Sequence, residues 1–558
     1  MRISFFALAA ALLPSPLLAD TLISHVNGIQ VGTDGKLQHF GALLIDDQGK
    51  VKTVLPDAKA FKGKADVTVD GEGRTLFPGM IDGHGHVMDL GVMLMIVQLT
   101  GSRSLADLEH RLATYAASHR DTAWILGFGW NQELWAEKRF PSAADLDAVV
   151  ADKPVMLERV DGHAVVVNSA AMKSAGVTRA TADPIGGKIE RDASGNPTGL
   201  FVDAATDLIR KVVPARTSAQ ADQALEKSQE TLLSVGVTAV GSMSTSVDDW
   251  SAFRRAGEAG KLKVRLISYL SGPESLKAVP HPTEWLYGDH ARAVGIKLFA
   301  DGALGSRGAW LKQPYSDKPD TRGLQFHSDA ELLDQANQAA AAGFQVATHA
   351  IGDAANAQAI TVYEQLHSKY RGDRRWRIEH FQIVDPADIP RLAPAGIIAS
   401  MQPTHQTSDR LMADKRLGPK RLAGAYAWQS VLKSGARLAF GTDFPVESPN
   451  PFPGLAAAIS RQDMQGQPPG GWIPSERLTF AQALSAYTRG AAYAGFAETI
   501  IGSLDPGKWA DFIIVDRDPS AADAQALART QVLETWVGGK KVWASGALAQ
   551  PATSASTR

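Results

Sequence analysis

Two histidines separated by one residue follow an apolar segment near position 80. Residues 77–81 are mostly apolar, and His84 and His86 come just after them. In an extended strand, residues i and i+2 point to the same face. The two imidazoles can therefore reach one point at the end of a strand, as the ligands of a divalent metal do. The pair alone is more typical of exposed histidines after a glycine-rich turn, so residues further along the chain decide between these interpretations.

Residues of metal-ligand type also end later apolar runs. Three of them are His349, His380 and Asp443. Each has an ordinary explanation alone, because single histidines are more often core or loop residues, and Asp443 could cap the next helix. Together with His84 and His86, they supply four imidazoles and one carboxylate on four predicted strand ends. This ligand set suits zinc.

The middle of the chain, about 78–495, alternates apolar runs with helical stretches. Helical periodicity is clear in four stretches, at 218–234, 329–342, 354–367 and 480–494. A strand followed by a helix, repeated along the chain, indicates a parallel sheet, and repetition on this scale predicts an α/β fold with a (β/α)8 TIM-like barrel. In such barrels the chemistry lies where the strands end.

Both ends of the chain carry short β-prone runs between Gly and Asp turns. They lie at 21–28, 43–47, 66–70, 511–516 and 532–539. Neither end is long enough to build a core alone, so we predict one small β-sandwich domain formed from residues 20–77 and 496–548. The barrel then spans 78–495 and carries an inserted α/β segment at 100–230, and residues 549–558 are expected to form a flexible tail.

The N-terminus has the pattern of a secretory signal peptide. Arg2 precedes an apolar run at 3–13, and Ala19 offers a small residue for cleavage before Asp20. The run is too short to span a bilayer as a helix of the mature protein. We therefore predict a signal peptide at 1–19 and a periplasmic or secreted protein without a stable membrane anchor. The alternative is that the segment stays uncleaved and anchors the protein.

Composition narrows the class of protein and the kinds of chemistry. The 558 residues are 44% hydrophobic and 21% charged, with a formal net charge of −2, as in ordinary soluble globular proteins. Nothing indicates a surface for polyanions, so nucleic acid is not an expected partner. There are no cysteines, which excludes thiolate metal sites, thiol nucleophiles and disulfides. The expected partners are a small-molecule substrate and a second copy in a possible homodimer.

The ordered set of ligand-type residues resembles that of the amidohydrolase superfamily. The set is His84, His86, Lys297, His349, His380 and Asp443. The wider phrases at 297–307, 348–353 and 441–446 resemble the branch that contains N-substituted formamide deformylase (amidohydrolase family 3). The resemblance covers nearly the whole mature chain, including the late return into the β-domain at 502–512.

The resemblance implies a site for two divalent metals, with zinc as the expected ion. His84 and His86 would bind the more buried metal, and His349 and His380 the more exposed one. Lys297, carbamylated by carbon dioxide, would bridge the two. An ammonium group cannot bind a metal, whereas a neutral lysine near two dications can form a carbamate that does. The alternative is one metal, with Lys297 an ordinary cation paired with Asp301 or Glu379.

The expected reaction follows from metal chemistry. A divalent metal lowers the pKa of a bound water toward neutrality, and Asp443 is expected to take the proton of that water and pass it to the leaving group. We expect hydrolysis of linear amide-type C–N bonds, in N-formyl or N-acyl amines. The alternatives are deamination, cyclic amide or ester hydrolysis at the same site, and a non-catalytic binding protein on this scaffold.

Substrate contacts are expected from the inserted segment and from two loops. In relatives the inserted segment covers the pocket, and Asp161 and His163 match its Asp-Gly-His phrase. Arg307 could hold a substrate carboxylate or stabilise its own loop. Gln402 and His405 follow the predicted strand at 397–401 and could face the site. The alternative for Asp161 and His163 is a purely structural part in their loop.

Overall fold

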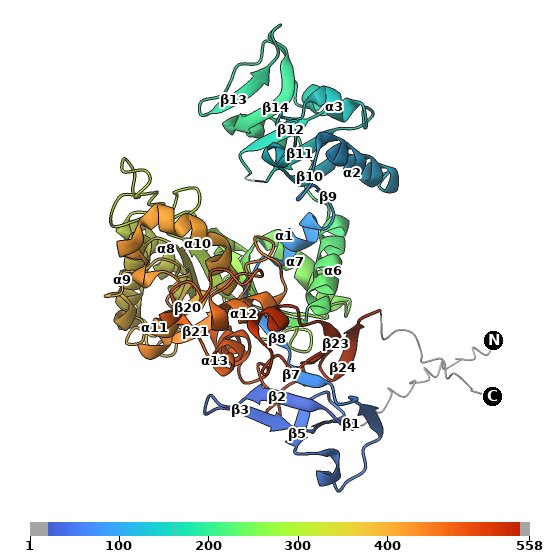
Figure 1. Cartoon of the computed structure of the whole chain (residues 1–558), viewed down its shortest axis with the longest axis vertical. Helices are drawn as coiled ribbons and strands as arrows, with labels where there is room; N and C mark the ends of the chain where they lie inside the picture. The colour runs from blue at the N-terminus through green and yellow to red at the C-terminus, as the bar shows by residue number, and fades with distance from the viewer. Residues whose placement is uncertain (1–19, 161, 547–558) are drawn as a thin grey trace, which may run out of the picture. The chain divides into compact units, whose positions relative to one another are not determined.

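The computed structural model describes residues 20–160 and 162–546 of the chain (Figure 1). The predicted signal peptide at 1–19, Asp161 and the predicted tail at 549–558 lie outside the described residues. The chain divides into two compact units. One runs from Val87 to Ser228, and the other contains the described residues before and after it.

The larger unit contains an eight-stranded parallel sheet that closes nearly into a barrel. The strands are β8 (Met80–Gly85), β15 (Val237–Thr245), β16 (Arg265–Ser271), β17 (Ala291–Phe299), β18 (Gln345–Ala350), β19 (Arg377–His380), β20 (Ile398–Met401) and β21 (Arg437–Phe440). The first and last strands meet so closely that a Cβ on Gly83 would lie 2.7 Å from the Phe440 carbonyl oxygen. The predicted (β/α)8 fold class is confirmed.

Helices alternate with most of these strands, as the sequence periodicity predicts. They include α6 (Ser218–Ser234), α7 (Val247–Glu258), α8 (Asp329–Ala341), α9 (Asp353–Lys369), α10 (Pro403–Leu417), α11 (Trp428–Lys433), α13 (Phe480–Ser485) and α14 (Ala491–Ala494). Serine side chains cap α7 and α8; for example, the Ser328 side chain accepts the Glu331 N–H at the start of α8.

Small and branched apolar side chains of the barrel strands are buried together, as in other barrels of this kind. Seven of the eight strands contribute to one buried cluster, with residues Ile81, Ala239, Ile267, Val294, Ala347, Ile398 and Ala439. Alanines of α14 pack against the same cluster. This apolar packing fixes the strands, so their carboxyl ends can hold polar side chains in set positions.

Both ends of the described chain form two further sheets in the larger unit. One has the order β24-β23-β22-β7-β2-β3 and the other β5-β4-β1-β6. Their bounds are β1 (Thr21–Ser24), β2 (Asn27–Val31), β3 (Leu37–Phe40), β4 (Ala42–Ile45), β5 (Val51–Leu55), β6 (Val67–Asp70), β7 (Thr75–Pro78), β22 (Phe512–Val515), β23 (Val532–Val537) and β24 (Lys540–Ala544). Antiparallel pairing of β22 with β7 joins the two ends, and Figure 1 shows the blue and red strands side by side.

The Val87–Ser228 unit has its own mixed sheet of order β13-β14-β12-β11-β10-β9. The strands are β9 (Val97–Gln98), β10 (Ile125–Trp130), β11 (Val155–Arg159), β12 (Ala164–Val167), β13 (Gly187–Arg191) and β14 (Pro197–Asp203). Its helices include α1 (Val87–Met93), α2 (Leu105–Ser118), α3 (Ala143–Asp147) and α4 (Ser169–Ser174). Within the described residues, no helix is both long enough and apolar enough to cross a membrane.

Candidate metal centre

The six predicted ligand residues all lie in or just after barrel strands. His84 is in β8 and His86 follows it; Lys297, His349 and His380 are in β17, β18 and β19; and Asp443 follows β21. Because the strands are parallel, their carboxyl ends share one rim of the barrel. Four of the six residues are buried within this rim: His84, Lys297, His380 and Asp443.

Backbone contacts bring Asp443 next to His84. The Asp82 carboxylate accepts the Thr442 backbone N–H (3.0 Å) and the Thr442 hydroxyl (2.6 Å). The Asp443 N–H then donates to the His84 carbonyl at 2.8 Å. Gly441 permits this approach, since a Cβ there would lie 2.5 Å from the His84 nitrogen. The chain after β21 is thereby fixed against the His-x-His strand.

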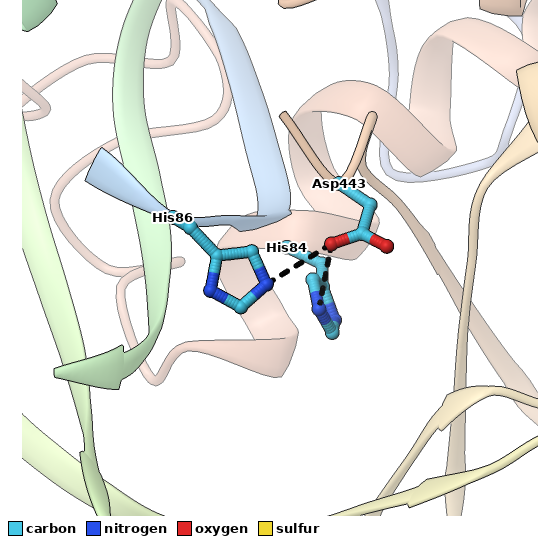
Figure 2. Close-up of side chains that lie close together, drawn as sticks. All are labelled: His84, His86 and Asp443. Carbon is cyan, nitrogen blue, oxygen red and sulfur yellow. Dashed lines mark ion pairs between the residues drawn. The ribbon is translucent and has the colours of Figure 1, made fainter. Parts of the chain in front are cut away.

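The Asp443 carboxylate faces imidazoles on both sides. Its Oδ1 lies 3.3 Å from His84 Nε2 and 3.1 Å from His86 Nε2, as Figure 2 shows. Its Oδ2 lies 3.6 Å from His405 Nε2 and 4.0 Å from His380 Nδ1. Neighbouring ligands of a tetrahedral zinc, at bond lengths of 2.0–2.2 Å, are about 3.3–3.6 Å apart. The distances from Asp443 Oδ1 to the two imidazole nitrogens are close to those between ligands of one metal ion.

Several of these atoms are buried without any hydrogen bond among the described residues. They are His84 Nε2, His349 Nε2, His405 Nε2 and Asp443 Oδ1. A buried polar atom without a partner costs about 1–3 kcal/mol, and native proteins leave few of them. His349 Nε2 lies 3.5 Å from Asp301 Oδ1. The lone pairs of the imidazoles and the carboxylate that meet at Asp443 fit the donor set of a divalent metal. The residues present therefore fit the group that the resemblance implies.

A carboxylate orients His84. His84 Nδ1 donates to Glu379 Oε2 at 2.6 Å, which leaves the lone pair of Nε2 directed toward Asp443. The fork of Arg377 holds Glu379 through Nε and Nη2 at 2.7 and 3.0 Å. Burial alone would raise the pKa of Glu379, but the charge of Arg377 and the His84 hydrogen bond outweigh it and lower that pKa. Carboxylate partners of this kind fix the tautomer of metal-binding histidines.

Gln402 plays the same part for His380. The His380 Nδ1–H donates to Gln402 Oε1 at 2.9 Å. The Gln402 amide nitrogen is buried and has no hydrogen bond among the described residues. The sequence predicts that this side chain contacts substrate; in the structure its oxygen accepts from a ligand candidate. His380 and Asp443 both adopt left-handed backbone, with φ of 74° and 61°, a strained conformation that clusters at functional sites.

Lys297 is buried at the end of β17. Burial disfavours the ammonium form and lowers the pKa of Lys297 to about 8, although Glu379 and Asp443 oppose the shift. The two carboxylates considered as its ordinary partners are engaged elsewhere. Glu379 pairs with Arg377, and Asp301 accepts backbone N–H groups from Trp310, Ile351 and Gly352.

The other predicted substrate residues have different surroundings. Arg307 forms a forked ion pair with Asp317 at 3.2 and 2.9 Å, so its guanidinium stabilises the loop after β17. His163 belongs to the Val87–Ser228 unit, where its Nδ1 lies 2.9 Å from Asp203 Oδ1. Sequence patterns suggest Glu379 only as an alternative ion-pair partner of Lys297 and suggest no part for Arg377. The sequence does contain a signal for this pair. Arg377 and Glu379 are residues i and i+2 of one predicted strand, so their side chains lie on the same face.

Comparison with known proteins agrees with this geometry. The chain is 35% identical over 554 residues to Protein LONG AFTER FAR-RED 3 of Arabidopsis thaliana (95% of this chain, 92% of that protein). It is 28% identical over 490 residues to the more distant N-substituted formamide deformylase of Arthrobacter pascens (84% and 89%). A crystal structure of an uncharacterized metal-dependent hydrolase from Pyrococcus horikoshii is similar with a TM-score of 0.77 at 30% identity (90% and 99%).

The sequence profile of the Amidohydrolase family matches residues 67–543, which include every ligand candidate and the whole barrel. Together with the relatives and the barrel rim, this match shows that the chain belongs to the amidohydrolase family and is a hydrolase.

Proposed function

We propose that this protein is a metal-dependent hydrolase that cleaves linear amide-type C–N bonds in N-formyl or N-acyl amines. The observation that carries the proposal is the buried Asp443 carboxylate, whose Oδ1 faces two imidazole nitrogens at 3.3 and 3.1 Å. The family match supports the hydrolase class. The formamide deformylase relative supports the substrate class, at the distance that its 28% identity implies.

His84, His86 and Asp443 would hold one divalent cation, with zinc the expected ion. His349 and His380 would serve a second, and a carbamate on Lys297 would bridge the two. The lowered pKa of Lys297, about 8, supports the bridge because the neutral amine is the form that reacts with carbon dioxide. A cation bound there lowers the pKa of water and polarises a carbonyl oxygen.

Asp443 would move the proton. Burial raises the pKa of its carboxyl, but the neighbouring imidazoles, His84 above all, lower it well below its usual value. The carboxylate is therefore ionised at neutral pH and can accept a proton from an attacking water. Asp443 would then deliver this proton to the departing nitrogen, because an amine leaves an amide poorly unless it is protonated. This transfer matters most for C–N cleavage.

Two other functions use the same residues. Deamination, cyclic amide hydrolysis or ester hydrolysis would need only a different substrate shape above the rim. A non-catalytic binding protein on this scaffold would be expected to lack several ligand residues, whereas this chain has all six. The chemistry of the products separates these cases.

The test is a product-resolved screen of the metal-replete protein. The panel contains N-formyl amines, N-acyl amines, cyclic amides, carboxylic esters and amino-substituted heterocycles, and Asp443→Asn is assayed in parallel to exclude contaminating activity. We expect a free amine and a carboxylic acid from the linear amides. Turnover restricted to the amino-substituted heterocycles (releasing ammonia), the cyclic amides (ring-opened product) or the esters (alcohol and acid) would support the other hydrolytic reactions. No turnover of any compound by metal-loaded protein would support a non-catalytic binding protein.

A further inference from the structure

We infer that His405 is a ligand of the second metal position, where it acts with His380 and with Oδ2 of Asp443. The resemblance to the family does not assign this histidine. The inference rests on the proposed function, in which His84, His86 and Oδ1 of Asp443 hold the first cation. It goes beyond that function by adding an imidazole, from a further strand end, to the second position.

The local fold places His405 at the rim. Strand β20 ends at Met401, and α10 begins at Pro403, so His405 lies in the first turn of this helix. Its side chain is buried, and its Nε2 has no hydrogen bond among the described residues. A buried imidazole nitrogen without a partner is costly. The position therefore implies a partner that a metal would supply.

The distances distinguish a ligand from a simple hydrogen bond. His405 Nε2 lies 3.6 Å from Asp443 Oδ2, which is too long for an N–H···O bond. The same distance falls within the range of about 3.3–3.6 Å expected between two ligands of one tetrahedral zinc. The pair is thus spaced as two ligands of a cation between them.

The two oxygens of Asp443 divide the imidazoles into two sets. Oδ1 faces His84 and His86, and Oδ2 faces His405 and His380. In each set, one ligand atom from each histidine and one from Asp443 lie within 4.8 Å of one another. Two-metal sites place their ions about 3.5–4 Å apart, a separation that a carboxylate with one oxygen on each ion can span.

The orientation of His380 is consistent with this arrangement. The 4.0 Å distance to Asp443 Oδ2 is from Nδ1, whose N–H is bound to Gln402, so Nε2 of the same ring is the nitrogen that keeps a lone pair for a metal. The rings of His380 and His405 stack with centroids 6.0 Å apart and planes 19° from parallel. Gln402 and His405 come from the same segment after β20. One short stretch would therefore supply both a ligand and the group that orients its neighbour.

The test is a Co²⁺ titration of the metal-free full-length protein, followed by the ligand-field absorption of the ion. Bound metal per protein is measured after equilibrium dialysis by elemental analysis. The variants are His405→Ala and the polar replacement His405→Gln, with His84→Ala to mark the first position. His281→Ala is the matched control, because this histidine is exposed and its Nδ1 lies 3.2 Å from the Ala342 carbonyl oxygen. Circular dichroism of each metal-free variant reports whether it is folded.

We expect the parent and His281→Ala to bind two equivalents. Both His405 variants should keep the first equivalent and bind the second at least about tenfold more weakly, with a changed Co²⁺ spectrum. The inference is overturned if a folded His405 variant binds two equivalents with the parent's affinity and spectrum, even if kcat falls. It is also overturned if the parent binds only one. A parent that binds no transition metal contradicts the proposed function itself, which is a distinct outcome.

Discussion

Asp443 and Asp511 are both buried carboxylates of the larger unit, but their hydrogen bonding differs. Asp511 receives the fork of Arg265 at 2.7 and 3.0 Å and the N–H of Gly538 at 2.7 Å. Asp443 faces imidazole nitrogens at 3.1, 3.3 and 3.6 Å, and its Oδ1 has no hydrogen bond among the described residues. Hydrogen-bond donors of the protein occupy both oxygens of Asp511, which we call the saturated carboxylate. Asp443 keeps an oxygen without a hydrogen bond, and we call it the open carboxylate.

The difference separates a structural cluster from a functional one. The Arg265–Asp511 pair joins strand β16 to the start of β22, so it holds the barrel against the sheets built from the chain ends. Saturation there leaves nothing for a ligand to contact. At Asp443 the unpartnered atoms and the left-handed backbone are both unfavourable for the protein alone. Sites that trade stability for activity have this character.

The largest effect is expected when the open carboxylate loses its basicity. Asp443→Asn keeps the shape and one ligating oxygen but cannot accept a proton at neutral pH. We expect kcat to fall by about 10²- to 10⁴-fold, while the first metal equivalent stays bound. Steady-state kinetics and elemental analysis of the same preparation measure both quantities. Near-parental kcat in a metal-loaded variant would show that Asp443 is not the proton carrier.

The saturated carboxylate should respond in stability instead. Asp511→Ala leaves Arg265 buried and unpaired, and breaking such a pair costs about 3–5 kcal/mol. We expect urea unfolding to shift by that amount, while the folded protein keeps its metal. Asp320→Ala, at an exposed ion pair with Lys318, is the control and should change little. If Asp511→Ala lost metal while keeping its stability, the contrast between the two clusters would be wrong.

A smaller effect is expected from a group that only orients a ligand. Gln402→Ala removes the acceptor of His380 Nδ1 and should weaken metal binding by about 10- to 100-fold. Competition with a chromophoric chelator measures this affinity. Gln335→Ala on α8, where the amide contacts His327, is the matched control. An unchanged affinity would mean that Gln402 does not position the ring.

The smallest effect on catalysis is expected when Arg307, which the sequence suggests as a substrate contact, is replaced. The Arg307 guanidinium is held by Asp317, so Arg307→Ala should change KM by less than about threefold. Loss of a charged contact to substrate would raise KM by about tenfold or more. A rise in KM of that size would show that Arg307 contacts substrate and that its ion pair with Asp317 breaks when substrate binds.

Much of the fold follows from patterns local in the sequence. Repeated strand and helix periodicity predicts the barrel, and the short β-prone runs at both ends predict the joined sheets. Ligand residue types at strand ends indicate the rim because parallel strands end together. Each of these signals depends only on residues near one another along the chain.

The orienting contacts depend on packing across the barrel, which single-sequence patterns do not contain. Glu379 and His84 are 295 residues apart and meet only because β8 and β19 belong to the same nearly closed barrel. Arg307 looks like a free cation in sequence, and its capture by Asp317 depends on how one loop folds back. The place of His405 beside Asp443 likewise needs the turn into α10.

The central claim is that the open cluster around Asp443 is a metal centre required for catalysis. The most direct measurement is elemental analysis of active protein, combined with activity before chelation, after chelation and after zinc is restored. We expect bound transition metal in the active protein, loss of turnover on chelation and recovery with zinc. Active protein that contains no transition metal, or activity that survives complete metal removal, would contradict the claim.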